Sequence, residues 1–171
     1  QPDILLCRTD RYLSKDIKSK IALFCNVEEE AVITAKDVAS IYEVPVVFAR
    51  EEVDTLALRY LHIDAKDRDL KQWEDIVHRV YNPKDEVTIG IVGKYVEYED
   101  SYKSLKEALV HGALAHNLKL VVNWIEAEGL ETGDKSFESQ LEGYDGILVP
   151  GGFGKRGIEG MLIAIRYARE K

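Results

Sequence analysis

The sequence is poor in cysteine and proline and contains no long apolar run. Its 171 residues include 2 cysteines and 4 prolines, which argues against a scaffold held by disulfide bonds. The longest apolar run, around residues 146–150, falls far short of the roughly 20 residues that span a bilayer, and no basic and apolar leader opens the chain. We therefore expect a cytoplasmic protein that contacts no membrane, with Cys7 and Cys25 as reduced thiols in its core.

An excess of positive charge is also missing. The chain has 23 Lys and Arg against 31 Asp and Glu, whereas sequence-independent binding of nucleic acid needs a dense basic surface. No nucleic-acid partner is expected, and an anionic substrate would need local cations. The remaining composition, 46% hydrophobic and 32% charged, is ordinary for a globular protein. Because the chain starts at Gln1 and stops inside a helical pattern, we expect a piece of a longer protein.

The first half of the sequence alternates strand and helix patterns. Residues 4–7 form a short apolar run that is typical of a buried strand, and Ser14 then precedes a helical pattern. The buried face of this helix is expected to carry Ile17, Ile21, Phe24 and Cys25. The pattern therefore predicts a strand followed by a covering helix.

A second strand and helix are expected to follow. Residues 31–33 indicate the strand, and Thr34 with Asp37 forms a capping-box pattern that predicts a helix start. Val44 and Pro45 predict the end of that helix, because the residue before a proline avoids helical angles. Further helices are expected over residues 51–61 and 70–81.

The polar segment 82–86 separates this part from stronger strand patterns, so we place a domain boundary there. Beyond it, the patterns predict strands over residues 87–92, 118–125 and 144–149, and helices over 102–116, 136–141 and 158–167. Alternating elements of this length favour parallel sheets that are covered on both faces. The expected fold class is α/β, with parallel sheets and flanking helices, in parts of two Rossmann-like domains joined by a linker.

Residues 151–154, Gly-Gly-Phe-Gly, follow the last predicted strand. Glycines at such a place let the backbone turn sharply and direct several N–H groups at one point, which suits an oxyanion. A plain turn is the alternative, because glycine turns are common between strands and helices. Residues 152–157 also match a dinucleotide-binding pattern that would place Lys155 and Arg156 near phosphates. The chain offers no acidic ribose ligand about 20 residues later, which disfavours that hypothesis.

Cationic side chains of the first half are candidates for binding an anionic nucleotide. Arg8 and Arg11 follow the first strand, and open α/β sheets bind ligands at the carboxyl ends of their strands. A structural ion pair with Asp10 or Asp3 is the alternative. Lys20 flanks the apolar face of its helix and could reach a triphosphate, although a helical lysine is usually solvated surface.

The segment from Lys36 through Asp37 to Val38 is expected to open a helix. The N–H groups at a helix start could bind a nucleobase or a phosphate, whereas the capping box would use them without any ligand. The four histidines show no metal-like spacing. We therefore expect neither a metal site nor a catalytic histidine.

Several strings along the chain together resemble one enzyme family. They are Arg8-Thr9-Asp10-Arg11, residues 20–27, Lys36-Asp37-Val38 with Ile41, Tyr42 and Pro45, residues 87–90 and 92–95, Asp100 with Tyr102-Lys103-Ser104, residues 149–154, and Arg156-Gly157. In order and spacing the chain resembles the CTP synthases, from about Gln1 to Lys171. Several of these strings are specific to that family rather than to α/β proteins at large.

The resemblance implies a segment of a two-domain enzyme. In CTP synthases an amidoligase domain uses ATP and Mg²⁺ to phosphorylate UTP, and a class I glutaminase domain supplies ammonia from glutamine. Residues 1–82 would be the last part of the amidoligase domain with the interdomain connection, and residues 83–171 the first half of the glutaminase domain. The resemblance also implies CTP as inhibitor, GTP as activator and a homotetramer of the complete enzyme.

The resemblance further implies roles for individual residues. Lys20 matches the lysine that binds UTP or CTP. The ATP-binding residues of the family match Arg8, Lys36, Asp37 and Val38. Gly151 and Gly152 match the oxyanion turn, and Gly152 with Phe153 matches the glutamine-binding residues.

Important parts of the family pattern have no counterpart in the sequence. These are the phosphate-binding loop, the Mg²⁺ ligands and the glutaminase Cys-His-Glu triad, so the chain alone is expected to be inactive. Cys7 and Cys25 lie in the wrong half and lack the setting of a nucleophile elbow. The alternative is a class I amidotransferase-like binding module without a nucleophile, which would explain residues 83–171 but not residues 1–50.

Overall fold

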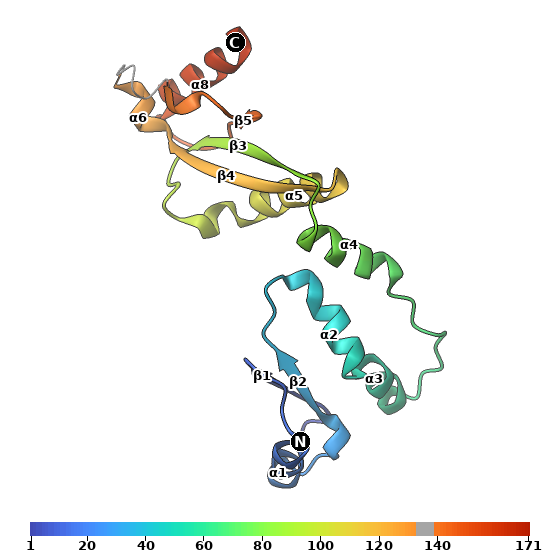
Figure 1. Cartoon of the computed structure of the whole chain (residues 1–171). Coiled ribbons are helices and arrows are strands. Elements are labelled where there is room, and N and C mark those ends of the chain that lie inside the picture. Colours follow the sequence, from blue (N-terminus) through green and yellow to red (C-terminus); the bar gives the residue numbers. More distant parts are fainter. Residues whose placement is uncertain (133–138) are drawn as a thin grey trace. The chain divides into compact units, whose positions relative to one another are not determined.

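The computed structural model describes residues 1–132 and 139–171 (Figure 1). The chain divides into two compact units, Gln1–His78 (unit 1) and Arg79–Lys171 (unit 2). The division falls inside helix α4 (Lys71–Tyr81), not at the polar segment 82–86. That segment is only partly a linker, because Asp85 and Glu86 already pair with the neighbouring strand through their backbones. The assignment of residues 1–82 and 83–171 to two enzyme domains stays a prediction.

Unit 1 begins with the predicted alternation of strands and helices. Strand β1 (Leu5–Thr9), helix α1 (Lys15–Cys25) and strand β2 (Val32–Lys36) are followed by helices α2 (Val44–Arg50), α3 (Val53–Leu61) and most of α4. The two strands pair in parallel, from Leu5 opposite Val32 to Thr9 opposite Lys36. Ala31, Ile33 and Leu56 form the buried core of this unit.

The predicted helix start at Thr34 and Asp37 is wrong. Thr34 lies inside β2 and is fully buried, and the capping box forms instead at Ser40, whose hydroxyl accepts from the Tyr42 N–H while Glu43 accepts from the Ser40 N–H. Pro45 does not end a helix but lies in the first turn of α2. Proline is tolerated there because the first N–H groups of a helix have no partner within the helix.

The expected buried face of α1 is mostly exposed. Phe24 is 87% exposed, Ile17 is 45% exposed and only Ala22 of this helix is buried. A sheet of two strands offers a covering helix little apolar surface, which explains the difference. The prediction of core thiols is wrong for Cys25, which is exposed, while Cys7 is half-buried.

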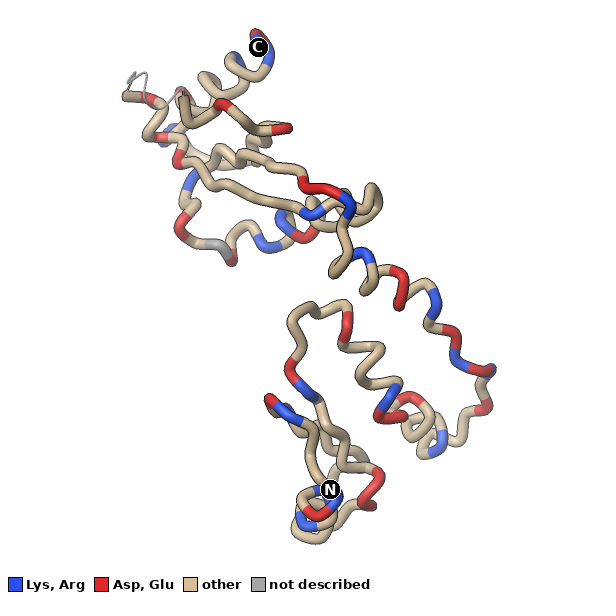
Figure 2. The backbone as a smooth tube through the Cα atoms, in the orientation of Figure 1, with Lys and Arg blue, Asp and Glu red and all other residues tan. Residues whose placement is uncertain are grey.

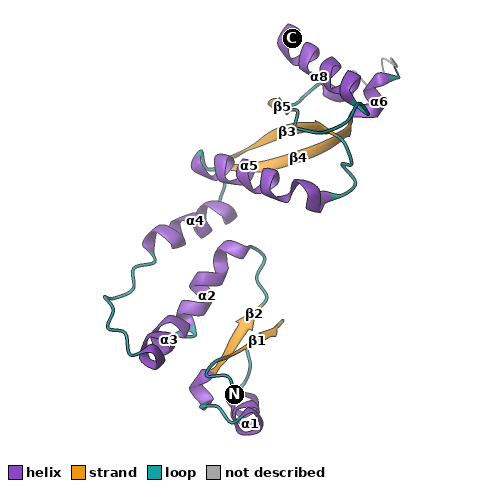
Figure 3. Ribbon diagram, turned by 180° about the vertical axis from the view of Figure 1, so that it is seen from behind, coloured by secondary structure: helices purple, strands orange, loops and turns teal. Residues whose placement is uncertain are grey.

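Unit 2 contains a parallel sheet of three strands in the order β4-β3-β5. Its elements are β3 (Asp85–Gly93), α5 (Lys103–Ala115), β4 (Leu118–Glu126), α6 (Ala127–Glu131), β5 (Gly146–Leu148) and α8 (Ile158–Glu170), shown by element type in Figure 3. The predicted helix over 136–141 lies partly outside the described residues, and within them Ser139–Leu141 forms a short 3-10 helix, η4. The predicted fold class, α/β with parallel sheets and flanking helices, is confirmed.

The core of unit 2 lies around its central strand. Ile91 and Val92 of β3 are both fully buried, and neighbouring strand residues point to opposite faces, so both faces of β3 are covered. On one face Val92 packs in a cluster that includes Ile125, Met161 and Ala164. Helices α6 and α8 approach so closely that a Cβ on Gly160 would lie 1.7 Å from the Ala127 carbonyl oxygen.

Charged residues of both signs are interspersed along the chain (Figure 2). Within the described ranges, no helix has the length and apolar character needed to cross a membrane.

Candidate functional sites

The carboxyl ends of β1 and β2 bring together residues that the sequence predicted for one site. The Arg8 Nε donates to Asp37 Oδ1 at 2.8 Å, although the two residues are 29 positions apart. The pairing of the strands causes this approach, because Thr9 lies opposite Lys36 and the Asp37 N–H donates to the Thr9 carbonyl at 2.8 Å. Parallel strands therefore place Arg8, Lys36 and Asp37 at one edge of the sheet.

This edge is open to solvent and carries mixed charge. The side chains of Arg8 and Asp37 are 85% and 52% exposed, and the hydrogen bond and charge of Asp37 raise the pKa of Arg8. Lys36 Nζ lies 5.9 Å from the centre of the Tyr12 ring, within cation–π range. The alternative of a structural ion pair holds for Arg11, which pairs with Asp10, whereas Arg8 uses neither Asp10 nor Asp3.

Val38 and Lys20 take no part in that ion pair. Val38 follows β2 in a loop and is half-buried, so the predicted helix N-terminus at this segment is wrong. Residues 36–38 continue from a strand into a loop because the backbone of Lys36 is paired with Thr9. Lys20 is exposed on α1.

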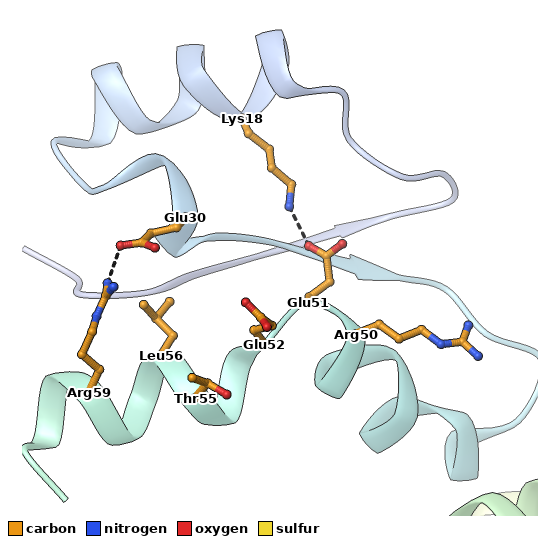
Figure 4. Close-up of a pocket in the computed structure, with 8 residues that line it drawn as sticks. All are labelled: Lys18, Glu30, Arg50, Glu51, Glu52, Thr55, Leu56 and Arg59. Atoms are coloured by element: carbon orange, nitrogen blue, oxygen red, sulfur yellow. Dashed lines mark hydrogen bonds and ion pairs between the residues drawn. The ribbon is translucent and has the colours of Figure 1, made fainter. Parts of the chain in front are cut away.

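Unit 1 also contains a charged cavity of about 340 Å³ (Figure 4). Lys18 lines it, and Lys20 is not among the lining residues. Lys18 Nζ lies 2.6 Å from Glu51 Oε2, and the same oxygen accepts from the Thr34 N–H at 2.9 Å. Burial opposes ionisation of Glu51, but these two donors outweigh it and lower the pKa of this carboxyl. Sequence reasoning missed Glu51 because its partners lie far away along the chain.

The glycine turn, residues 151–154, follows β5 in unit 2. All four residues are exposed, and the Phe153 side chain is completely so. Gly154 has a φ of 79°, a conformation that glycine adopts at little cost. The turn is therefore an accessible loop of irregular backbone between a strand and α8, as predicted.

A buried lysine, Lys94, forms hydrogen bonds with the backbone of this turn. Lys94 directly follows β3 and is only 4% exposed, and its Nζ donates to the carbonyl oxygens of Phe153 and Gly154, both at 3.0 Å. The Tyr102 hydroxyl in turn donates to the Lys94 carbonyl at 2.5 Å. We did not predict a role for Lys94, although its place at the carboxyl end of a buried strand is a signal that could have found it.

A second cavity, of about 360 Å³, lies beside the turn and is lined in part by Tyr95, Glu126 and Arg156. The Arg156 guanidinium lies 5.0 Å from the centre of the Tyr95 ring and forms an ion pair with Glu128. Glu126 accepts from the Val96 N–H with one oxygen, while its other oxygen is buried without a hydrogen-bond partner among the described residues. The Arg156 side chain therefore makes its contacts within unit 2.

Neither cysteine belongs to the unit that carries the glycine turn. Cys7 and Cys25 both lie in unit 1. Among residues 1–132 and 139–171 no group of three or more His, Cys, Asp or Glu side chains could hold a metal ion. The described chain thus presents an exposed glycine turn in unit 2 and, in unit 1, a sheet edge that carries Arg8, Lys36 and Asp37.

Two family models match the sequence in succession. Residues 1–63 match the CTP synthase N-terminus, and residues 97–171 match the class I glutamine amidotransferases. The chain is 79% identical to the CTP synthase of Koribacter versatilis over 170 residues, which are 99% of this chain and 30% of that protein. It is 76% identical to the CTP synthase of Acidobacterium capsulatum, covering 99% of this chain and 31% of the relative.

Among solved structures, the glutaminase domain of Trypanosoma brucei CTPS with bound acivicin is similar at 37% sequence identity. The similarity covers 49% of this chain and 33% of that chain, with a TM-score of 0.46. The chain spans about 30% of the length of the curated relatives that it matches.

Proposed function

Because the chain belongs to the CTP synthase family, we propose that it is a segment of a glutamine-dependent CTP synthase. The complete enzyme would convert UTP, ATP and glutamine into CTP, ADP, phosphate and glutamate. One observation carries the proposal: the two family matches fall in order in one chain, the first inside unit 1 and the second inside unit 2. A binding module derived from an amidotransferase alone would leave the match of residues 1–63 unexplained.

In unit 1 we assign the sheet edge that carries Arg8, Lys36 and Asp37 to nucleotide binding. Arg8, Lys36, Asp37 and Val38 would contact ATP, and Lys20 would contact UTP or the inhibitor CTP. An exposed guanidinium can stack on a purine ring and an ammonium can pair with phosphate oxygens, so the side chains suit these ligands. Mg²⁺ would arrive with ATP, and we assign it no ligand and no step in this chain.

In unit 2 we assign the glycine turn to the binding and hydrolysis of glutamine. Attack of a thiolate on the glutamine amide creates a tetrahedral oxyanion, which backbone N–H donors stabilise. Gly151 and Gly152 would supply that oxyanion site, and Gly152 with Phe153 would contact the substrate. The nucleophile would belong to a part of the enzyme that this chain does not include. Activation by GTP, assembly as a homotetramer and a cytoplasmic location complete the proposal.

A chimera tests this function directly. The matched 170-residue segment of the Koribacter versatilis relative is replaced by this chain, and CTP formation is measured with glutamine and, separately, with ammonium chloride. The chimera should form CTP from either nitrogen source. A folded chimera without CTP synthesis would contradict the proposal, and so would release of ammonia from glutamine by the 171-residue chain alone.

Substitution of Lys20 tests the nucleotide assignment within the chimera. Lys20→Ala should weaken the use of UTP and inhibition by CTP, while glutamine hydrolysis remains measurable. Lys15→Ala, at the start of the same helix and also exposed, is the matched control and should change neither. Equal loss of CTP synthesis and glutamine hydrolysis in Lys20→Ala would count against this role.

A further inference from the structure

We propose that Lys94 is a positioning residue that holds the oxyanion turn in its reactive shape and places a buried positive charge beneath it. This inference rests on the proposed glutaminase function of unit 2. The match to the class I amidotransferases begins at residue 97, so it assigns no role to Lys94.

The first support is the direction of two successive peptides. The carbonyl groups of Phe153 and Gly154 both point at the Lys94 ammonium, each at 3.0 Å. In a trans peptide the N–H of the next residue points opposite to the carbonyl. The N–H groups of Gly154 and Lys155 must therefore point away from the ammonium. The positive φ of Gly154 lets both carbonyls turn to the same side.

The second support is the closeness of the ammonium to the residue assigned to the oxyanion site. A Cβ built on Gly152 would lie 3.8 Å from Lys94 Cδ and 4.0 Å from Lys94 Nζ. The lysine side chain thus runs directly beneath Gly152. A larger residue at Gly152 would contact this side chain, so the turn and the lysine are fitted to each other.

The third support is the lack of a compensating charge. Within the described part of the chain, no carboxylate lies within ion-pair distance of Lys94, whose side chain is almost fully buried. Burying an ammonium that is not paired with an anion is unfavourable, and an apolar side chain of equal length would fill the same space without this cost. A charge in this position is explained if it acts on a transient negative oxygen above it, where low polarity strengthens the attraction.

The proposed role of Lys94 leads to a specific kinetic prediction. Lys94 would contribute to the transition state more than to the binding of glutamine, because the negative oxygen forms only during the reaction. Its loss should lower kcat for glutamine hydrolysis and leave KM for glutamine nearly unchanged. CTP synthesis from added ammonia does not use the oxyanion and should be retained.

The test uses Lys94→Met in the chimera, because methionine keeps most of the length and removes the charge. We expect kcat for glutamine hydrolysis to fall about 10- to 100-fold, less than the loss typical of a deleted oxyanion donor. CTP formation from ammonium chloride should stay within about twofold, and the melting temperature should be unchanged or higher. The matched control is Lys119→Met, which should alter neither activity. Lys119 is exposed and lies near the start of β4, whereas Lys94 follows the far end of the neighbouring strand β3.

Three outcomes would overturn the proposal. They are glutamine hydrolysis within about twofold of the unsubstituted chimera, an equal loss of both activities, and a rise in KM without a fall in kcat. If Lys94→Met does not fold, Lys94→Gln is measured instead, since glutamine keeps a hydrogen-bond donor and removes the charge. Full glutaminase activity in Lys94→Gln would also overturn the proposal. A selective loss of glutaminase activity would support it. If the unsubstituted chimera itself hydrolysed no glutamine, the proposed function would fall first, and this inference with it.

Discussion

The two candidate sites both lie at the carboxyl ends of parallel strands, but their charges are held in opposite ways. In unit 1 Arg8 and Asp37 pair on an exposed edge, with side chains 85% and 52% exposed. In unit 2 Lys94 is 4% exposed, and within the described residues its ammonium donates to the carbonyl oxygens of Phe153 and Gly154. An exposed pair can rearrange around a ligand, whereas a buried contact fixes the backbone before any ligand arrives.

The difference follows from how much sheet each unit contains. Among the residues that the structure describes, unit 1 has two strands and unit 2 has three, with the central strand buried on both faces. Two paired strands are only marginally stable by themselves, and α1 leaves Phe24 and Leu23 exposed. Unit 2 thus holds its glycine turn by a buried contact, whereas unit 1 carries its charged side chains on an exposed edge.

Among the substitutions that test this comparison, Gly160→Ala in unit 2 should have the largest effect on stability. The new Cβ would lie 1.7 Å from the Ala127 carbonyl oxygen, so α6 and α8 would have to separate. We expect unit 2 to lose about 3 kcal/mol of its free energy of unfolding, without any change in unit 1. Urea unfolding followed by Trp124 fluorescence, in a Trp73→Phe background, reports unit 2 alone.

Gly112→Ala is the control for this substitution. Gly112 lies on α5, and a Cβ there would meet nothing within 4 Å. Alanine favours a helix over glycine by about 1 kcal/mol, so this variant should be slightly more stable. Destabilisation by both variants would show that unit 2 is not packed as described.

A smaller effect is expected from Glu51→Gln in unit 1. The Glu51 carboxylate accepts from Lys18 and from the Thr34 N–H, and its side chain is 14% exposed. Loss of this charge should cost unit 1 about 1–2 kcal/mol, measured by urea unfolding with Trp73 as the probe. Glu52→Gln, at the exposed neighbouring residue, should leave the unfolding midpoint unchanged.

The effect of Glu51 should also depend on pH. Because folding lowers the pKa of this carboxyl from its ordinary value of 4.5, its contribution is fully present above that value. It is lost as the pH falls below 4.5 and through the lower pKa of the folded state. The stability difference between the unsubstituted chain and Glu51→Gln should therefore shrink on acidification. A constant difference from pH 7 to below 4.5 would contradict the assignment.

The smallest effect on stability is expected from Arg8→Ala. Its ion pair with Asp37 is solvent-exposed, and such pairs contribute little to folding. The midpoint of unfolding should stay the same, but in the chimera KM for ATP should rise several-fold. Arg11→Ala removes a pair with Asp10 that is also solvent-exposed and should change neither property. A rise in KM in both variants would indicate a general effect of surface charge.

The local patterns predicted most elements but misplaced their boundaries where two signals competed. Thr34 with Asp37 and Ser40 with Glu43 both have the spacing of a capping box, and only the second forms. The first cannot form because Thr34 pairs within β2, opposite Cys7. Pairing between distant segments thus overrode a local helix signal, and no sequence window of a few residues contains that information.

By itself the sequence determined the α/β class, the family, a glycine turn between the last strand and the last helix, and candidate cations near the ends of the first two strands. Periodicity and turn residues act within a few positions, so they can be recognised without knowledge of the fold. Only the tertiary structure decided that Arg8 contacts Asp37, that Glu51 contacts Lys18 and that Lys94 lies beneath the turn. These contacts join residues 29 to 60 positions apart, and the contact of Lys94 is also buried.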